Sequence, residues 1–340
     1  MINSVYRLTS PGIIEETFIE VDLDDDVVIR PTYMSICQAD QRYFRGNRAP
    51  EILKQKLPMA LIHEAVGEVV RDFTGTFKPG DKVVVIPNTP TEEDDIIQEN
   101  YIRSSRFRSS GFDGFMSDYV ISKKDRVIRL PDDIDLRVAS FIELISVSVH
   151  AISRFEMFAH ERKNRIGVWG DGNVGFITSL LLKIFYPDCE VIVFGKNLEK
   201  LSYFSFADDV YNINEIPEGF SIDHGFECVG GFKAESAINQ IIDIINPQGS
   251  IALLGVSENN VGINTRMVLE KGLNLFGSSR SGREDFEKTV QMISENEEIV
   301  NYLESLIANV VPIKSIKDIT EAFNADFNSG FGKTILEWNK

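Results

Sequence analysis

The chain has 340 residues, 43% of them hydrophobic and 26% charged, with a formal net charge of -17 at pH 7. This length exceeds what one compact core usually holds, so we expect two domains. The negative charge argues against a general nucleic-acid or anionic-membrane binder, because phosphate groups are held by basic surface. Neither a signal-peptide pattern nor an apolar run of membrane-spanning length is seen. The 3 widely spaced cysteines do not indicate a disulfide framework and favour a reducing cytoplasm.

The first third of the chain predicts an irregular, mostly antiparallel β domain. Short β-rich runs are separated by turn residues such as Pro79-Gly80-Asp81. These runs occupy residues 26–30, 65–70 and 82–86.

From about residue 166 the pattern changes to strand, glycine turn and helix. Predicted strands lie at 166–169, 190–194, 225–229, 250–254 and 273–276, separated by sequence compatible with helices. This alternation predicts a parallel sheet with helical crossovers. The last part contains a predicted helix at 285–293 and a terminal strand at 333–337, which we expect to return to the first domain.

The turn after the first strand of this sheet has the pattern of a dinucleotide site. Gly170-Asp171-Gly172-Asn173-Val174-Gly175 is a G-x-G-x-x-G sequence, flanked by a short apolar strand and an apolar helix. The three glycines permit a tight turn, backbone approach to a pyrophosphate and close helix packing. We therefore predict a doubly wound Rossmann domain and interpret an ordinary glycine turn as the weaker alternative.

The end of the next strand bears on the choice of cofactor. An acidic residue there would hydrogen-bond the ribose 2′-hydroxyl of NAD, but the chain has Gly195-Lys196-Asn197. A lysine in place of the carboxylate favours the 2′-phosphate of NADP through charge pairing. A solvated loop lysine is the alternative interpretation of Lys196.

Two segments of the first domain resemble the zinc-containing medium-chain dehydrogenases. Cys37 and Asp40 are similar to their C-x-x-D, and His63-Glu64 with Gly67 is similar to their G-H-E-x-x-G, although Ile62 replaces the first glycine. The segments at 79–83 and 111–120 also resemble that family, and the likeness covers essentially the whole chain. Without it, Cys37 would be interpreted as a small core residue.

The resemblance implies a GroES-like catalytic domain beside the Rossmann domain, an α/β protein overall. The implied boundaries are residues 1–147 for the catalytic domain, 148–280 for the NADP-binding domain and 281–340 for the return to the catalytic domain. It also implies cytoplasmic location and, by analogy, a homodimer.

The resemblance further implies a catalytic zinc held by Cys37, His63 and Glu143, with Glu64 as an exchangeable fourth ligand. Glu143 stands where polyol-type members place a zinc-binding glutamate, although Leu144 replaces the usual proline. Asp40 would orient His63 and fix its tautomer. A turn-stabilising aspartate is the alternative for Asp40.

The chain departs from the family pattern in two places. Residues 88–111 contain no cysteine, so we expect no structural zinc and a single catalytic one. The usual hydroxyl relay residue is replaced by Ala39, which cannot pass a proton. Tyr43 stands where sorbitol-type members place an active-site tyrosine, so it is the candidate for substrate contact and proton transfer, with core packing as the alternative.

A compact basic segment lies where other members carry the cysteine lobe. Arg103, Arg106 and Arg108 are interspersed with serines at 101–110, and the segment leads toward the expected cleft. Arginines supply forked donors that suit a phosphate, so we interpret this segment as a sugar-phosphate site, with Arg42 in reserve. A solvated basic loop is the alternative.

The segment at 100–116 also resembles one subgroup, the ribulose-5-phosphate reductases, which supply bacterial teichoic-acid and capsule synthesis. The resemblance implies reduction of D-ribulose 5-phosphate to D-ribitol 5-phosphate by NADPH, with zinc polarising the ketone. An NAD-linked polyol dehydrogenase acting on an unphosphorylated sugar alcohol is the alternative within enzymes. A dinucleotide-binding protein without catalysis is the alternative outside them.

Overall fold

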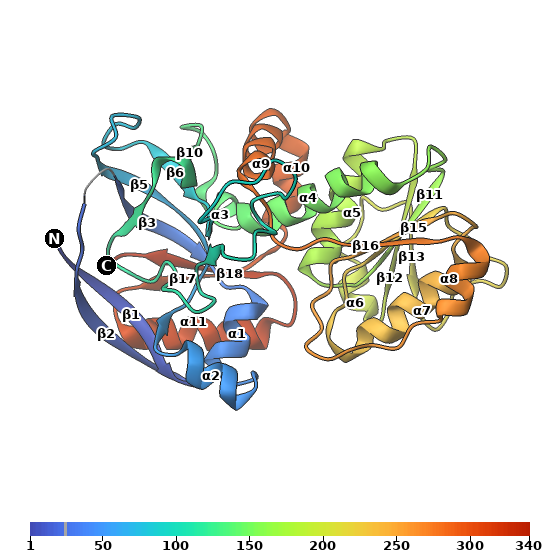
Figure 1. Cartoon of the computed structure of the whole chain (residues 1–340), viewed down its shortest axis with the longest axis horizontal. Helices are drawn as coiled ribbons and strands as arrows, with labels where there is room; N and C mark the ends of the chain where they lie inside the picture. The colour runs from blue at the N-terminus through green and yellow to red at the C-terminus, as the bar shows by residue number, and fades with distance from the viewer. Residues whose placement is uncertain (24–25) are drawn as a thin grey trace. The chain divides into compact units, whose positions relative to one another are not determined.

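The computed structural model describes residues 1–23 and 26–340 (Figure 1). Its contacts divide the chain into two compact units. Unit 1 comprises Met1–Ser146 and Ser281–Lys340, and unit 2 comprises Val147–Arg280. None of the helices in the described residues combines the length and the apolar character that a membrane span requires.

Unit 1 is built around a seven-stranded sheet in the order β10-β6-β5-β3-β18-β17, with β9 also paired to β3. A three-stranded sheet, β2-β1-β4, and a two-stranded ribbon, β7-β8, complete it. The pairings are antiparallel except that of β17 with β18. The strands are β1 (Ile2–Ser10), β2 (Ile13–Glu20), β3 (Val27–Ser35), β4 (Met59–Ala60), β5 (Glu64–Asp72), β6 (Lys82–Val85), β7 (Asn88–Thr89), β8 (Arg106–Phe107), β9 (Val120–Ser122), β10 (Val127–Arg129), β17 (Ile307–Ile313) and β18 (Lys333–Trp338).

The C-terminal segment of the chain belongs to the core of unit 1. Strand β18 pairs antiparallel with β3, and helix α11 (Ile316–Ser329) packs on β17 and β18 (Figure 1). Ile319, Ala322 and Phe323 are fully buried, and their spacing of three and four residues places them on one face of the helix. The other helices are α1 (Gln38–Phe44), α2 (Pro50–Lys56), α3 (Leu136–Ala139), α9 (Arg283–Glu295) and α10 (Glu297–Glu304), with a 3-10 turn at Lys124–Arg126; α4 (Ile142–Phe158) runs from unit 1 into unit 2.

Unit 2 is a six-stranded parallel sheet in the order β13-β12-β11-β14-β15-β16. The first strand in sequence is therefore central, and the chain winds outward first to one side and then to the other. This confirms the predicted doubly wound sheet. The strands are β11 (Arg165–Trp169), β12 (Glu190–Gly195), β13 (Asp209–Asn212), β14 (His224–Glu227), β15 (Ser250–Leu253) and β16 (Asn274–Gly277).

The helices of unit 2 alternate with its strands. They are α5 (Asn173–Phe185), α6 (Leu198–Leu201), α7 (Ala234–Ile244) and α8 (Thr265–Lys271), with a 3-10 turn at Gly231–Lys233. Helix α5 packs on β11 and β12, and α7 packs on β14. Strands of a parallel sheet that helices cover have continuous apolar sequences, and Val191 to Phe194 in β12 is an example.

Candidate metal centre and cofactor loop

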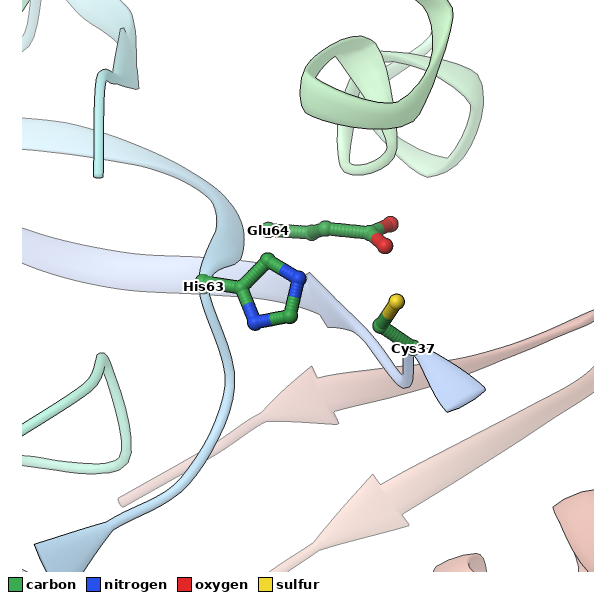
Figure 2. A group of neighbouring side chains, drawn as sticks. All are labelled: Cys37, His63 and Glu64. Atoms are coloured by element: carbon green, nitrogen blue, oxygen red, sulfur yellow. The ribbon is translucent and has the colours of Figure 1, made fainter. Parts of the chain in front are cut away.

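Three side chains of unit 1 meet as a potential metal site. The ligand atoms of Cys37, His63 and Glu64 all lie within 4.8 Å of one another. Figure 2 shows the Cys37 sulfur and the Glu64 carboxylate directed into the space beside the His63 ring. The register of the sheet explains the meeting, because Ser35 at the end of β3 pairs with Glu64 at the start of β5. Cys37 follows two residues later.

Asp40 joins three chain segments at this site. Its carboxylate accepts hydrogen bonds from the backbone N–H of Cys37 (3.2 Å), from that of Ile62 (3.0 Å) and from Ser109 Oγ (2.5 Å). Asp40 Oδ2 also lies 3.5 Å from His63 Nδ1. The residue is fully buried, so these contacts fix the cysteine, the histidine and the loop at 109 relative to one another.

The charges around His63 favour its protonated form in the protein without metal. Burial alone lowers the pKa of His63, but the Asp40 carboxylate and Cys37 outweigh it and raise the pKa well above its usual value. Burial raises the pKa of Asp40, yet His63, Ser109 and Ile62 lower it further than burial raises it. The pocket thus carries negative potential that suits a cation.

The backbone beside His63 is held in an uncommon conformation. Ile62 has φ 71°, in the left-handed region that disfavours a β-branched residue, and this is the position where the family pattern has glycine. Its carbonyl accepts from Phe115 N (2.8 Å), and its N–H donates to Asp40. Gly114 permits the close approach, because a Cβ there would lie 2.3 Å from the Ile62 carbonyl oxygen. Packing and hydrogen bonds therefore offset the strain.

Lys333, at the start of β18, is a site residue that the sequence interpretation missed. It is 1% exposed, its Nζ donates to the Ile36 carbonyl (2.8 Å), and it lies 2.9 Å from both carboxylate oxygens of Glu64. The only signal was a lysine at the start of the terminal strand. Lys333 is thus an ionic partner of this fully buried carboxylate.

Glu143 lies near this cluster without joining it. The group of ligand atoms within 4.8 Å does not include its carboxylate. Glu143 is 5% exposed in the first turn of α4, and burial raises its pKa to about 7, with His63 opposing and Glu64 adding to the rise. The Glu143 carboxylate is therefore close enough for the charges of His63 and Glu64 to change its pKa.

Two arginines of the basic segment at 101–110 lie over aromatic rings of unit 1. Arg103 and Arg106 are exposed, and Arg106 lies over the Phe112 ring at 5.5 Å. Arg108 donates to the Ile121 carbonyl (2.7 Å) and lies over the Phe115 ring at 5.2 Å. Burial lowers the pKa of Arg108 to about 10. Arg108 is thus already engaged by a backbone carbonyl and an aromatic ring, and the role of a phosphate ligand stays a prediction for all three arginines.

Tyr43 and Arg42 both lie on α1. Tyr43 is 2% exposed, and Arg42 is half-buried. The Tyr43 hydroxyl has no hydrogen-bond partner within residues 1–23 and 26–340, and the ring lies beneath two cations, Arg48 and Lys56.

The segment at 88–111, which lacks cysteine, is held by an ion pair. Arg126 donates to both carboxylate oxygens of Glu99, at 2.9 and 3.1 Å, and Arg283 N donates to the same carboxylate at 2.7 Å. Asn88 Nδ2 also donates to the Glu99 carbonyl. The bidentate pair with a 5%-exposed arginine side chain anchors the segment.

The glycine-rich loop of unit 2 lies where β11 meets α5. Gly170 has φ 135°, and a Cβ on Gly175 would lie 1.9 Å from the Gly170 carbonyl oxygen. Gly172 precedes Asn173 and Val174, which begin α5, so the loop presents the N-terminus of a helix. Such a terminus suits a pyrophosphate.

Asp171 connects this loop to the end of β12. Its carboxylate accepts hydrogen bonds of 2.8 Å from the backbone N–H groups of Lys196 and Asn197. The Lys196 side chain is exposed, whereas Gly195 is buried. A Cβ on Gly195 would lie 2.7 Å from Leu201 Cδ2 and 2.8 Å from Asp171 Cβ, so any substitution there disturbs the loop.

Comparison with known proteins assigns the chain to a family. Residues 23–132 match the alcohol dehydrogenase GroES-like domain, and residues 188–295 match the zinc-binding dehydrogenase model. The chain belongs to the zinc-binding medium-chain dehydrogenases, and the predicted fold class and family are confirmed.

Within this family, the chain is similar to ribulose-5-phosphate reductases. One from Bacillus spizizenii is 57% identical over 339 residues, 99% of each chain. The crystal structure of S. aureus TarJ in complex with NADPH superposes with a TM-score of 0.90 at 52% identity, covering 100% of both chains. The D-xylulose reductase of Saccharomyces cerevisiae is 26% identical, covering 97% of this chain and 96% of that one.

Proposed function

We propose that the protein catalyses the NADPH-dependent, zinc-assisted reduction of D-ribulose 5-phosphate to D-ribitol 5-phosphate. The observation that carries this proposal is 57% identity over the full length to a ribulose-5-phosphate reductase. The cluster of Cys37, His63 and Glu64 supports it, because thiolate, imidazole and carboxylate are the ligands that catalytic zinc uses.

The residues of unit 1 would hold one zinc ion. Cys37 and His63 supply two ligands, while Glu64 and Glu143 are the carboxylates available to complete the set. When bound, zinc acts as a Lewis acid toward the ketone oxygen of the substrate. Asp40 keeps the His63 ring in place and directs its other nitrogen toward the site. Lys333 holds Glu64 and balances its charge.

We propose that this zinc is the only one in the chain. The segment at 88–111 has no cysteine, and the Glu99–Arg126 ion pair anchors it instead. Structural zinc sites are closed sets of four ligands, mostly cysteines, which this segment does not offer.

Unit 2 would bind NADPH, which supplies the hydride. The loop from Gly170 to Gly175 receives the pyrophosphate, and Asn197 with Lys196 lies at the end of β12, where the adenine ribose is bound in this fold. The exposed ammonium of Lys196 favours a 2′-phosphate. The S. aureus relative in complex with NADPH agrees with this choice.

Tyr43 is the proposed substrate-contacting residue of α1. Ala39 cannot relay a proton, and the free hydroxyl of Tyr43 is the group on that helix able to donate one. We also propose a homodimer, by family analogy, and a cytoplasmic location, with which the 3 free cysteines agree. Sedimentation would test the dimer.

The deciding experiment measures kcat/KM of the zinc-loaded protein for ribulose 5-phosphate and ribulose, each with NADPH and NADH. We expect ribulose 5-phosphate with NADPH to be the best pair. Oxidation of unphosphorylated polyols by NAD at a higher kcat/KM would favour a polyol dehydrogenase. Cofactor binding without turnover of any sugar would favour a non-catalytic protein.

A further inference from the structure

Cationic and hydroxyl side chains gather in unit 1 around Tyr43. Lys56, the last residue of α2, donates a 3.0 Å hydrogen bond to Ser110 Oγ, and its Nζ lies 5.8 Å from the centroid of the Tyr43 ring. The guanidinium carbon of Arg48 lies 4.9 Å from the same centroid. Lys56, Ser110, Tyr43 and Arg48 are referred to below as the Tyr43 cluster.

The charge of Lys56 has no acidic counterpart. No ion pair joins Lys56 to a carboxylate in the described part of the chain, although acidic residues outnumber basic ones by 52 to 35 in the sequence. The residue is half-buried, and its stem runs past Gly111, where a Cβ would lie 3.7 Å from Lys56 Cγ. A half-buried ammonium with a second cation over the same ring attracts an anion.

The loop that carries Ser110 is fixed before any ligand arrives. Ser109 has φ 60°, and its N–H donates to the Phe112 carbonyl at 2.9 Å. Ser110 N donates to the Phe107 carbonyl at 3.2 Å. The Ser110 hydroxyl therefore has a set position beside the ammonium, which lowers the entropy lost on binding a phosphate.

The same loop connects the Tyr43 cluster to the metal centre. Ser109 donates to Asp40, which holds Cys37 and His63, and the Phe107 ring lies 5.4 Å from the His63 ring. Tyr43 follows Cys37 by six residues along α1, a rise of roughly 9 Å. From a metal ion, through its bound ketone oxygen, to a phosphorus five bonds beyond the carbonyl carbon, the distance in an extended sugar would also be roughly 9 Å.

We propose that the Tyr43 cluster binds the phosphate monoester of the sugar substrate, with Lys56 as the main cation and Ser110 as the hydroxyl donor. The assignment rests on the proposed function for the identity of the sugar. It places the phosphate on residues that lie together, rather than on Arg103, Arg106 and Arg108, of which Arg108 already donates to the Ile121 carbonyl.

The test is the ratio of kcat/KM for ribulose 5-phosphate to kcat/KM for ribulose. In Lys56→Met we expect this ratio to fall about ten- to one-hundred-fold, because a charge-assisted contact to the phosphate is lost. Lys56→Arg should retain most of the ratio. Lys54→Met is the matched control, since it removes the same charge from an exposed position of α2 and should change the ratio by less than about twofold. Circular dichroism and zinc content verify that each variant is folded and loaded.

Calorimetry with inorganic phosphate separates this proposal from the proposed function. If the zinc-loaded protein fails to reduce ribulose 5-phosphate but binds phosphate more weakly after Lys56→Met, the function is wrong and the site stands. If Lys56→Met leaves both the ratio and the phosphate affinity unchanged, the site is overturned while the function is retained. A ratio that falls in Arg106→Ala and not in Lys56→Met would also overturn it.

Discussion

Replacing Lys333 by methionine tests whether the buried contact with Glu64 supports the metal centre. The substitution keeps the length of the aliphatic chain and removes the ammonium, whose nitrogen lies 2.9 Å from both oxygens of Glu64. Glu64 is 0% exposed, so its carboxylate would remain buried without a cationic partner. Removing one member of a buried pair costs about 3–5 kcal/mol of unfolding free energy, and we expect this loss in the metal-free protein.

Bound zinc should reduce that loss, because the metal supplies a positive charge to the same carboxylate. The zinc dissociation constant of Lys333→Met should accordingly be lower than that of the wild-type protein. The double variant Glu64→Gln with Lys333→Met leaves neither member of this pair charged, and should recover most of the stability.

Urea unfolding with and without a chelator measures both effects. Lys317→Met is the control, because Lys317 is an 83%-exposed lysine side chain paired with Glu321 at 3.4 Å, and such surface pairs contribute at most about 1 kcal/mol. A metal-free Lys333→Met protein as stable as this control would refute the reasoning. So would a double variant less stable than the single one.

Three further outcomes are expected. Cys37→Ser should abolish both zinc binding and activity, and elemental analysis should find one zinc per wild-type chain; two tightly held zincs would contradict the proposal. Lys196→Ala should lower the NADPH over NADH preference about tenfold in steady-state kinetics, and an unchanged preference would show that Lys196 does not meet the 2′-phosphate. Burial lowers the pKa of His224 from 6.5 to about 4, so the folded protein keeps this ring neutral down to about pH 4, whereas the unfolded chain binds a proton below pH 6.5. The free energy of unfolding therefore falls as the pH drops from 6.5 toward 4. Between pH 7 and 5 the free energy of unfolding falls by about 2 kcal/mol for this reason. His224→Gln should make the fall less steep in denaturant titrations. An equally steep fall would exclude His224 as its source.

The sequence predicted the fold class because its strongest patterns are local. Apolar strands and the glycine turn define β11, β12 and α5 without reference to the rest of the chain. Strand β13 was missed, because Asp209–Asn212 is a mixed polar run at the sheet edge and lacks an apolar repeat. Its strand identity depends on pairing with β12, which no local pattern reveals.

The candidate site was predictable only as far as its motifs extended. Cys37, His63 and Glu64 stood in recognisable sequences, and the sheet register brings them together. Lys333 and Lys56 belong to no recognisable sequence motif. Their roles depend on contacts with Glu64 and Ser110, which lie 269 and 54 positions away in the sequence. The basic run at 101–110 predicted a phosphate site, but the sequence alone could not show that Arg108 donates to the carbonyl of Ile121.

The Glu99–Arg126 ion pair bears on the order of events when the protein matures. A lobe held together by an ion pair between two of its own side chains can form as soon as the polypeptide folds. A lobe held together by four cysteines and a zinc ion forms only when the metal binds. The newly made apoprotein would then already present Cys37, His63 and Glu64 in position, and metal loading would be a late step. If the chain holds a single zinc, as proposed, cobalt introduced at that step would give an absorption spectrum that reports on one coordination environment.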